Sequence, residues 1–216
     1  MSEIKKRKLS QLTRAETIPL KRSNTVTKRE ARKIAERVVN KNVEWKYYSV
    51  YNNANVTTSG SIVDLSAVPQ GDTDITRDGD ELTASSLGYR YSWVNGDDNQ
   101  MCRIIFFQWF PQTTPVVTDI PLTTTGNGIQ FMYHTDKAPM YKILYDESEV
   151  LNVKFTGGSE NGPVHSGKIK IPRKKIQFQA GGTTGSSKVY ALLLSDSSVA
   201  SHPGARLITK LNYKDM

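Results

Sequence analysis

From Trp45 onward, hydrophobic and polar residues alternate along most of the chain, which is the pattern of β-strands buried on one face. Residues 82–94 show it most clearly, because four large side chains fall on one face: Leu87, Tyr89, Tyr91 and Trp93. The last such segment, residues 206–213, alternates in the same way. Turn residues separate the segments, and no strand–helix alternation follows. The pattern predicts an all-β sandwich or barrel of about eight antiparallel strands, and that count fits a jelly roll.

Other segments depart from simple alternation. Residues 101–110 are apolar on both faces, which predicts a central strand or one whose second face is covered. Residues 111–139 form a long Thr/Pro/Gly-rich excursion, expected to contain a short helical turn near residues 116–120 and to lie on an exposed or inter-subunit surface. Residues 141–145 and 150–155 are predicted as separate strands. In residues 167–178 the apolar phase slips around Pro172, which predicts a bulge or an edge strand.

Residues 27–40 instead show a helical period. Thr27 followed by Glu30 is a capping-box pattern, because each side chain can satisfy a free backbone N–H at a helix start. Four apolar residues then recur at helical spacing and form one stripe: Ala31, Ile34, Ala35 and Val38. Basic residues occupy the other faces, and like charges four apart oppose an isolated helix. We expect this helix to be stable when its stripe packs against another subunit and an anion neutralises its basic faces.

Charge is distributed unevenly along the chain. The first 46 residues hold 14 Lys/Arg against 5 Asp/Glu, whereas the remaining 170 hold 15 against 16. Residues 1–26 have no hydrophobic period, and we expect them to be disordered when free. The predicted domains are therefore a basic N-terminal arm over residues 1–44, with an amphipathic helix at about 27–40, and a strand-rich body over residues 45–216. Such an arm is typical of a protein that binds a polyanion.

Nucleic acid is the polyanion that the arm fits best. Lys and Arg contacts to phosphates release counterions and give salt-dependent affinity. A membrane surface fits less well, because the apolar stripe lacks the Trp, Phe and Leu of an interfacial anchor. A solvating tail would not require an amphipathic helix. The candidate nucleic-acid-binding residues are Lys5, Lys6, Arg7, Lys8, Arg14, Lys21, Arg22, Lys28, Arg29, Arg32, Lys33 and Arg37. A second basic cluster, residues 168–175, is equally well interpreted as another phosphate-facing surface or as a charged edge strand protected against wrong pairing.

No catalytic or metal-binding constellation stands out. The three histidines, His134, His165 and His202, lie in separate turn-like or loop-like segments without zinc spacing. Cys102 lies in an apolar run and is expected to be a small buried residue. Residues 181–186 lack the Gly-Lys-Ser/Thr ending of a phosphate-binding loop and precede a strand, so a hairpin loop is expected. We expect no enzymatic activity and no required cofactor.

The N-terminal residues are charged and lack the apolar segment of a secretory signal. No apolar run approaches the length of a membrane span. We therefore expect a soluble, intracellular product with no membrane partner.

Residues 68–109 resemble a signature of small jelly-roll capsid proteins. The matching pieces are Gln70-Gly71-Asp72, Arg77-Asp78-Gly79-Asp80 and Arg103-Ile104-Ile105-Phe106-Phe107-Gln108-Trp109. Similar pieces follow in the same order: Tyr141-Lys142-Ile143-Leu144-Tyr145-Asp146, Tyr190-Ala191-Leu192-Leu193-Leu194-Ser195-Asp196 and Leu211-Asn212-Tyr213-Lys214-Asp215. The family includes satellite tobacco necrosis virus-like capsids and those of circular single-stranded DNA viruses (CRESS-DNA, circovirus-like). The resemblance covers most of the body.

The resemblance implies an eight-stranded antiparallel jelly-roll sandwich with a basic, partly helical arm. It also implies a viral capsid protein that self-assembles into a sixty-subunit T=1 icosahedral shell, with arms directed inward to a single-stranded genome. We expect DNA, with RNA as the alternative, and a host receptor that the sequence does not identify. The clusters at residues 5–8 and 21–22 are predicted to act as a nuclear localisation signal. The expected locations are then the virion and, during assembly, the host nucleus.

The resemblance further implies a calcium hypothesis. Satellite-like members bind calcium between subunits through an acidic loop and an acidic residue near the chain end, and the matching positions are Asp72, Asp78, Glu81 and Asp215. Asp78 and Glu81 would contribute backbone carbonyls. Calcium accepts several oxygen ligands in a flexible loop, but the spacing by itself favours a solvated acidic loop over residues 69–81.

Two alternatives belong to other classes. One is a non-viral or non-assembling nucleic-acid-binding protein with a jelly-roll body, which particle formation would distinguish from a capsid. The other is a cupin-like jelly-roll enzyme, which needs a His/Glu metal cluster that the sequence does not show.

Overall fold

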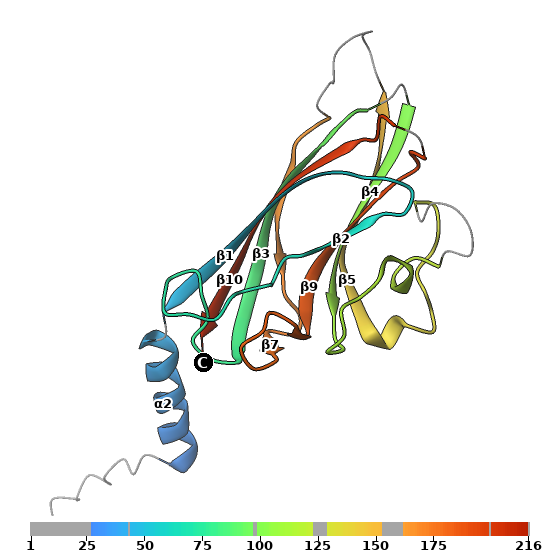
Figure 1. Ribbon diagram of the computed structural model, residues 1–216. Coiled ribbons are helices and arrows are strands. Elements are labelled where there is room, and N and C mark those ends of the chain that lie inside the picture. Colours follow the sequence, from blue (N-terminus) through green and yellow to red (C-terminus); the bar gives the residue numbers. More distant parts are fainter. Residues whose placement is uncertain are drawn as a thin grey trace, which may run out of the picture. The chain divides into compact units, whose positions relative to one another are not determined.

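The computed structural model describes residues 27–42, 44–96, 99–122, 129–152, 162–198 and 200–215. The chain divides into two compact units, Met1–Asn42 and Val43–Met216. The first contributes one described element, the helix α2 (Lys28–Asn42), and the second contains the strands (Figure 1). The expectation of disorder in residues 1–26 lies outside the described residues and stays a prediction. Among the helices that the structure describes, none is long and apolar enough to cross a membrane.

Helix α2 begins with the capping box that its sequence predicts. The Thr27 N–H donates to Glu30 Oε2 at 2.9 Å, and the Glu30 N–H donates to Thr27 Oγ1 at 3.2 Å. The hydrogen bonds from the Thr27 backbone and hydroxyl lower the pKa of Glu30. Ile34 and Val38 of the apolar stripe are exposed. The helix therefore has a fixed start and an apolar face in contact with solvent.

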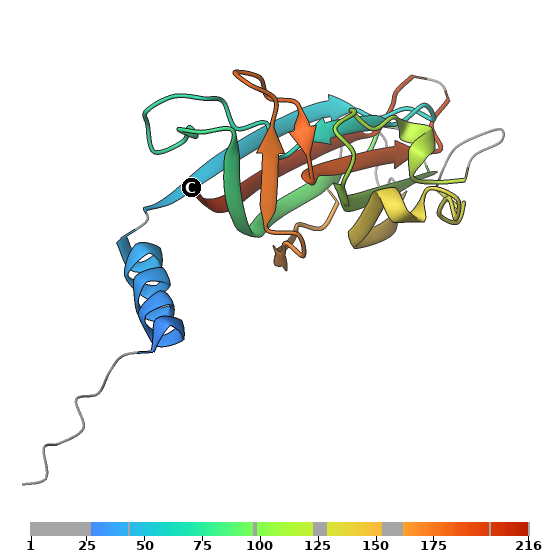
Figure 2. The same ribbon diagram turned by 90° about the horizontal axis from the view of Figure 1, so that it is seen from below.

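The second unit is an all-β sandwich of two antiparallel sheets, which confirms the predicted fold class. One sheet has the order β1-β10-β3-β7-β8, with β6 also paired to β3, and the other has the order β2-β9-β4-β5. Successive strands such as β1 and β2, or β3 and β4, lie in different sheets, as in a jelly roll. Figures 1 and 2 show β1, β10 and β3 side by side in one layer. The strands are β1 (Trp45–Asn55), β2 (Ser61–Asp64), β3 (Glu81–Val94), β4 (Asn99–Trp109), β5 (Tyr141–Asn152), β6 (His165–Lys170), β7 (Lys175–Phe178), β8 (Gly185–Ser186), β9 (Lys188–Ser195) and β10 (Gly204–Asp215).

The described residues form ten strands rather than the predicted eight, and the boundaries differ in two places. The predicted strands at residues 141–145 and 150–155 belong to one strand, β5, as far as Asn152, and residues 153–155 lie outside the described residues. The apolar pattern missed this continuity because the intervening inward positions carry Glu147 and Glu149. The predicted strand at residues 167–178 is split into β6 and β7. Both halves pair with β3, and the chain leaves that strand around Pro172, where the sequence predicts an irregularity. The two-residue strand β8 lies in the segment that was predicted as a hairpin loop.

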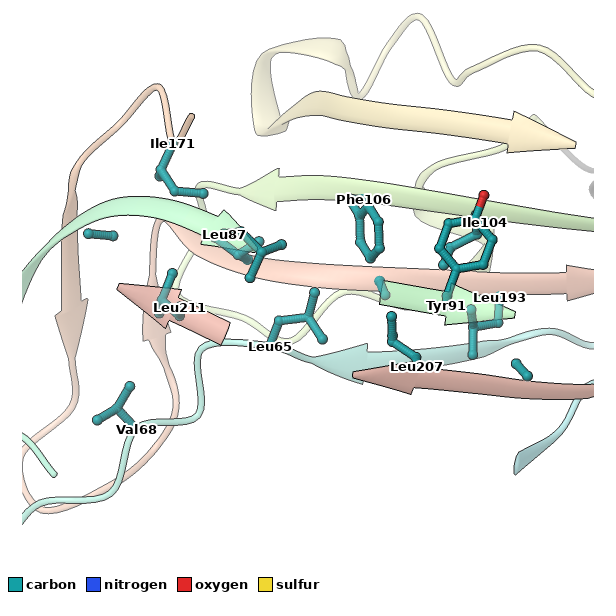
Figure 3. Packing of buried hydrophobic residues seen from close by; sticks show 14 of the residues in the cluster. Leu65, Val68, Leu87, Tyr91, Ile104, Phe106, Ile171, Leu193, Leu207 and Leu211 are labelled. Atoms are coloured by element: carbon teal, nitrogen blue, oxygen red, sulfur yellow. The ribbon is translucent and has the colours of Figure 1, made fainter. Parts of the chain in front are cut away.

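The main hydrophobic core lies between the two sheets (Figure 3). The alternating segments 82–94 and 206–213 supply its side chains from β3 and β10, as their patterns predict. Strands β4 and β9 supply the facing layer. The residues in contact across the core include Leu87, Tyr91, Leu207, Leu211, Ile104, Phe106 and Leu193. Burying each of these large side chains stabilises the fold by roughly 1.5–3 kcal/mol.

The excursion covers the outer face of the four-stranded sheet. A second hydrophobic cluster joins Ile120 and Ile129 of the excursion to the outward side chains of β4 and β9: Ile105, Phe107, Trp109, Tyr190, Leu192 and Leu194. This cover explains why residues 101–110 are apolar on both faces, and Cys102 is buried as expected. The predicted helical turn is η1 (Val117–Asp119), and a second one is η2 (Ala138–Met140). On the outer side of the excursion, Met132 is 82% exposed.

Candidate nucleic-acid interface and neighbouring polar clusters

Helix α2 carries the described part of the predicted nucleic-acid-binding set. The side chains of Lys28, Arg29, Arg32 and Lys33 are exposed and lie within two turns of the helix. Arg37 belongs to the same helix, and its side chain lies outside the described residues. The remaining candidates also lie outside them: Lys5, Lys6, Arg7, Lys8, Arg14, Lys21 and Arg22. Four exposed cations on one short segment are compatible with phosphate contacts, and their role in nucleic-acid binding stays a prediction.

The second basic cluster, residues 168–175, is divided by the fold. Lys168 and Lys170 lie on β6 with exposed side chains. Lys175 on β7 forms an ion pair with Glu81 at 2.6 Å. Arg173 instead lies over the ring of Phe110, with its guanidinium carbon 3.6 Å from the ring centroid. Arg173 is thus separated from the lysines of the cluster by its contact with Phe110.

Asp78 of the acidic loop and Asp215 near the chain end meet at the side chain of Lys46. Lys46 Nζ lies 3.1 Å from Asp78 Oδ1 and 2.8 Å from Asp215 Oδ2, and the Asp78 N–H donates to Asp215 Oδ2 at 3.3 Å. Burial opposes the charge on Lys46, but the hydrogen bonds to Asp215 and Asp78 outweigh it and raise the pKa of Lys46. The ammonium group is therefore fixed between the two carboxylates.

This arrangement bears on the calcium hypothesis. Glu81 is paired with Lys175, and Asp72 is exposed on the loop. Within the described ranges, no group of three or more His, Cys, Asp or Glu residues is placed to hold a metal ion. An ammonium group lies between the side chains of Asp78 and Asp215, so the Asp215 carboxylate that the hypothesis assigns to calcium is already paired within its own chain.

Calcium binding between subunits stays a prediction. It requires that calcium chloride titrated into the assembled protein release or absorb heat, and that a chelator lower the melting temperature of the assembly. Titration without heat, together with an unchanged melting temperature, would dispose of the hypothesis. Magnesium chloride at the same ionic strength is the control for a general salt effect.

Arg103 of β4 fastens the excursion to the sandwich. Its Nε and Nη2 donate to the two oxygens of Asp146 at 2.8 and 2.6 Å, and its Nη1 donates to the carbonyls of Ile129 and Phe131, each at 2.9 Å. The Tyr133 hydroxyl also donates to Asp146. An open cavity of about 390 Å³ lies at this point. The two charged groups that line it are paired with each other, which indicates a structural clamp.

The clamp has a predicted pH dependence. Burial disfavours the charge on Asp146, but the hydrogen bonds from Arg103 and Tyr133 outweigh it and lower the pKa of Asp146. A carboxyl with a lowered pKa in the folded chain adds stability above its unfolded pKa, and this contribution is lost as the pH falls through the folded pKa. The excursion should therefore stay protected from hydrogen exchange at neutral pH and loosen below about pH 4.

Hydrogen exchange of residues 129–133, followed by mass spectrometry against pH, measures this effect. Asp146→Asn should remove the protection already at pH 7, whereas Asp136→Asn, at an exposed position of the same excursion, should not. Equal protection in the Asp146→Asn variant and the unaltered protein would contradict the clamp.

A histidine–carboxylate cluster that the sequence did not indicate joins β6 to β5. His165 Nε2 lies 3.3 Å from Glu149 Oε2, an ion-pair distance without hydrogen-bond alignment, and its Nδ1 lies 3.6 Å from Glu147 Oε2. The imidazole stacks on Tyr91 at 4.8 Å, and the Tyr91 hydroxyl donates to Glu147 at 2.8 Å. Burial raises the pKa of Glu149, and His165 opposes that rise. The cluster links β5 at the edge of one sheet to β6 of the other sheet. Residue spacing along the sequence does not show that these two strands lie close together.

The chain resembles a known viral protein in sequence over most of its length. It is 25% identical over 190 residues to the capsid protein of satellite tobacco necrosis virus 1, covering 83% of this chain and 92% of that protein. No protein-family model matches the chain. The sequence similarity supports the expected resemblance to satellite tobacco necrosis virus capsids, whereas the resemblance to circular single-stranded DNA virus capsids stays a prediction.

Solved structures of viral particles are more distant. T=1 particles derived from infectious bursal virus match with a TM-score of 0.17 at 13% identity, over 80% of this chain and 40% of that one. The Gx strain of infectious bursal disease virus matches with a TM-score of 0.17 at 9% identity, over 80% of this chain and 42% of that one. The chain spans less than half the length of these solved chains.

Proposed function

We propose that this chain is a viral capsid protein that assembles into a sixty-subunit T=1 icosahedral shell and packages a single-stranded genome through its basic arm. The observation that carries the proposal is the sequence similarity to a capsid protein over 92% of that protein's length. The all-β sandwich body is compatible with it. The role is structural, without enzymatic activity.

Assembly would account for apolar groups that a single chain leaves in water. On helix α2, Ile34 and Val38 are each 53% exposed. On the body, Val150 is 56% exposed and Met132 is 82% exposed. A contiguous apolar stripe such as the one that contains Ile34 and Val38 is typical of a protein–protein contact, whereas single exposed residues such as Val150 and Met132 are normal on a protein surface. A closed symmetric shell also presents many arms to one nucleic acid, so that weak phosphate contacts add up to strong retention.

Electron microscopy of the expressed full-length protein tests the proposal. The expected result is discrete icosahedral particles that contain nucleic acid protected from nuclease, with an ultraviolet absorbance ratio that nuclease treatment does not change. Monomers at physiological salt would overturn the capsid proposal and favour a non-assembling nucleic-acid-binding protein. Particles without nucleic acid would overturn the packaging part alone.

We further propose a DNA genome and assembly in the host nucleus. The basic clusters at residues 5–8 and 21–22 would then act as import signals. A fluorescent reporter fused to residues 1–26 should accumulate in nuclei, and replacing both clusters by alanine should return it to the cytoplasm. A reporter that is equally distributed with and without the clusters would contradict nuclear import. Sensitivity of the released nucleic acid to DNase or RNase identifies the genome type.

A further inference from the structure

The outer face of the six-stranded sheet is formed by alternate residues of five strands. Leu87, Leu211 and Ile169 point into the core, so that the residues flanking them along their strands face away from it. Strand pairing then places outward residues in rows across the sheet. One row is Trp45, Lys214, Thr83 and Lys175, and another is Ser49, Lys210, Gly88 and Lys168.

This face is strongly basic. Its cationic side chains are Arg90, Lys168, Lys170, Lys175, Arg206, Lys210 and Lys214. Among the outward residues that the structure describes on this six-stranded sheet, Glu81 is the only acidic residue, and it forms an ion pair with Lys175. Residues 43–216 together hold 16 Lys/Arg and 17 Asp/Glu. Seven of the 16 Lys/Arg residues of a neutral body therefore lie on one face of one sheet.

Aromatic rings line the β1 side of the same face. Trp45, Tyr47 and Tyr51 are 58%, 41% and 67% exposed. Lys214 Nζ lies 4.7 Å from the Trp45 ring centroid, and Lys210 Nζ lies 4.1 Å from the Tyr47 ring centroid. The face therefore combines rings and positive charges at neighbouring positions.

Small side chains separate the lysines of β10 from those of β6. Strand β3 lies between them and presents Thr83, Gly88 and Ser92 outward, together with the cation Arg90. The two rows of lysines are thus about 10 Å apart, and opposite Lys168 and Lys210 the residue between them is Gly88.

We propose that this face is a second binding surface for single-stranded nucleic acid, with its cations contacting phosphates and the β1 rings stacking on bases. Charge complementarity selects a polyanion, and the exposed rings select an unpaired strand, because only unpaired bases offer their faces for stacking. Positive charge can also protect an exposed edge strand against wrong pairing. That explanation does not apply to Lys210 and Lys214, because their strand β10 is an interior strand, paired with both β1 and β3. The inference rests on the proposed packaging of nucleic acid and assigns part of it to the body.

Fluorescence anisotropy of a labelled oligothymidine with the full-length protein, measured over a series of salt concentrations, tests the inference. Each lost phosphate contact should reduce the slope of log affinity against log salt by about 0.7. The combined variant Lys168→Ala, Lys170→Ala and Lys210→Ala should therefore reduce it by about 2. Lys142→Ala, at an exposed lysine of the other sheet, is the control and should leave the slope unchanged.

The rings give an independent measurement. Trp45→Ala should weaken oligothymidine binding by about tenfold, whereas Trp45→Tyr should retain most of the affinity because tyrosine also stacks. An unchanged slope in the combined variant overturns this inference and leaves packaging by the arm intact. If that variant fails to assemble but keeps its slope, the face is an interface between copies and the inference is overturned. Failure of the unaltered protein to bind oligothymidine overturns the proposed packaging as well.

Discussion

Replacing Arg77 by methionine should lower the free energy of unfolding by about 3–5 kcal/mol. Arg77 is 0% exposed although it carries a charge. Its guanidinium donates to the carbonyls of Val68 at 3.3 Å and Gly182 at 2.6 Å, and to that of Gly79. Methionine fills similar space but donates no hydrogen bond, so these carbonyls would lose their donor. Urea unfolding followed by fluorescence measures the loss.

Arg173→Met is the matched control. The guanidinium of Arg173 lies 3.6 Å from the Phe110 ring centroid, much as that of Arg77 lies 4.2 Å from the Phe178 centroid, but Arg173 is exposed. Its replacement should cost less than about 1 kcal/mol. Equal losses in the two variants would show that the ring contact, and not the buried hydrogen bonds, accounts for the role of Arg77.

Deleting residues 1–42 should remove most of the packaging and leave the body folded. Both hydrophobic clusters of the body are formed by residues after position 42, so the melting temperature should change by no more than about 3 °C. The deleted segment holds 13 Lys/Arg and 4 Asp/Glu. If about ten of these cations contact phosphates, the slope of log affinity against log salt should fall by about 7. Affinity near physiological salt should fall by about a thousandfold or more.

A shorter deletion, of residues 1–26, separates the two parts of the arm. It removes Lys5–Lys8, Arg14, Lys21 and Arg22 but keeps the basic residues of α2, so the slope and the protected nucleic acid should be intermediate. Nuclease-protected nucleic acid per particle is the measurement for both deletions. A protein without residues 1–42 that packages as much nucleic acid as the full chain would contradict the role of the arm.

Local patterns predicted the fold where one face of a strand is uniformly apolar. Residues 82–94 and 206–213 alternate because one side meets the core, and residues 101–110 are apolar throughout because the excursion covers their second side. The pattern failed at β5, where Glu147 and Glu149 occupy inward positions. Their partner His165 lies on β6, in the other sheet, and no local rule brings those strands together.

Among the polar sites too, local contacts could be predicted from the sequence and contacts between distant segments could not. The capping box of α2 involves residues three apart and could be predicted from the sequence. The contact of Lys46 with Asp78 and Asp215 joins three distant segments, so no local pattern in the sequence could predict this pair of ion pairs. The basic face of the six-stranded sheet was equally hidden, because its lysines come from separate strands and meet only through the pairing of β10, β3 and β6.

The mass of the purified full-length protein tests the capsid proposal most directly. Native mass spectrometry at physiological salt, before and after nuclease treatment, should show a closed particle of sixty chains together with nucleic acid that the nuclease does not remove. Monomers, or open oligomers whose size increases continuously with protein concentration and that bind nucleic acid only in a nuclease-sensitive form, would contradict the proposal.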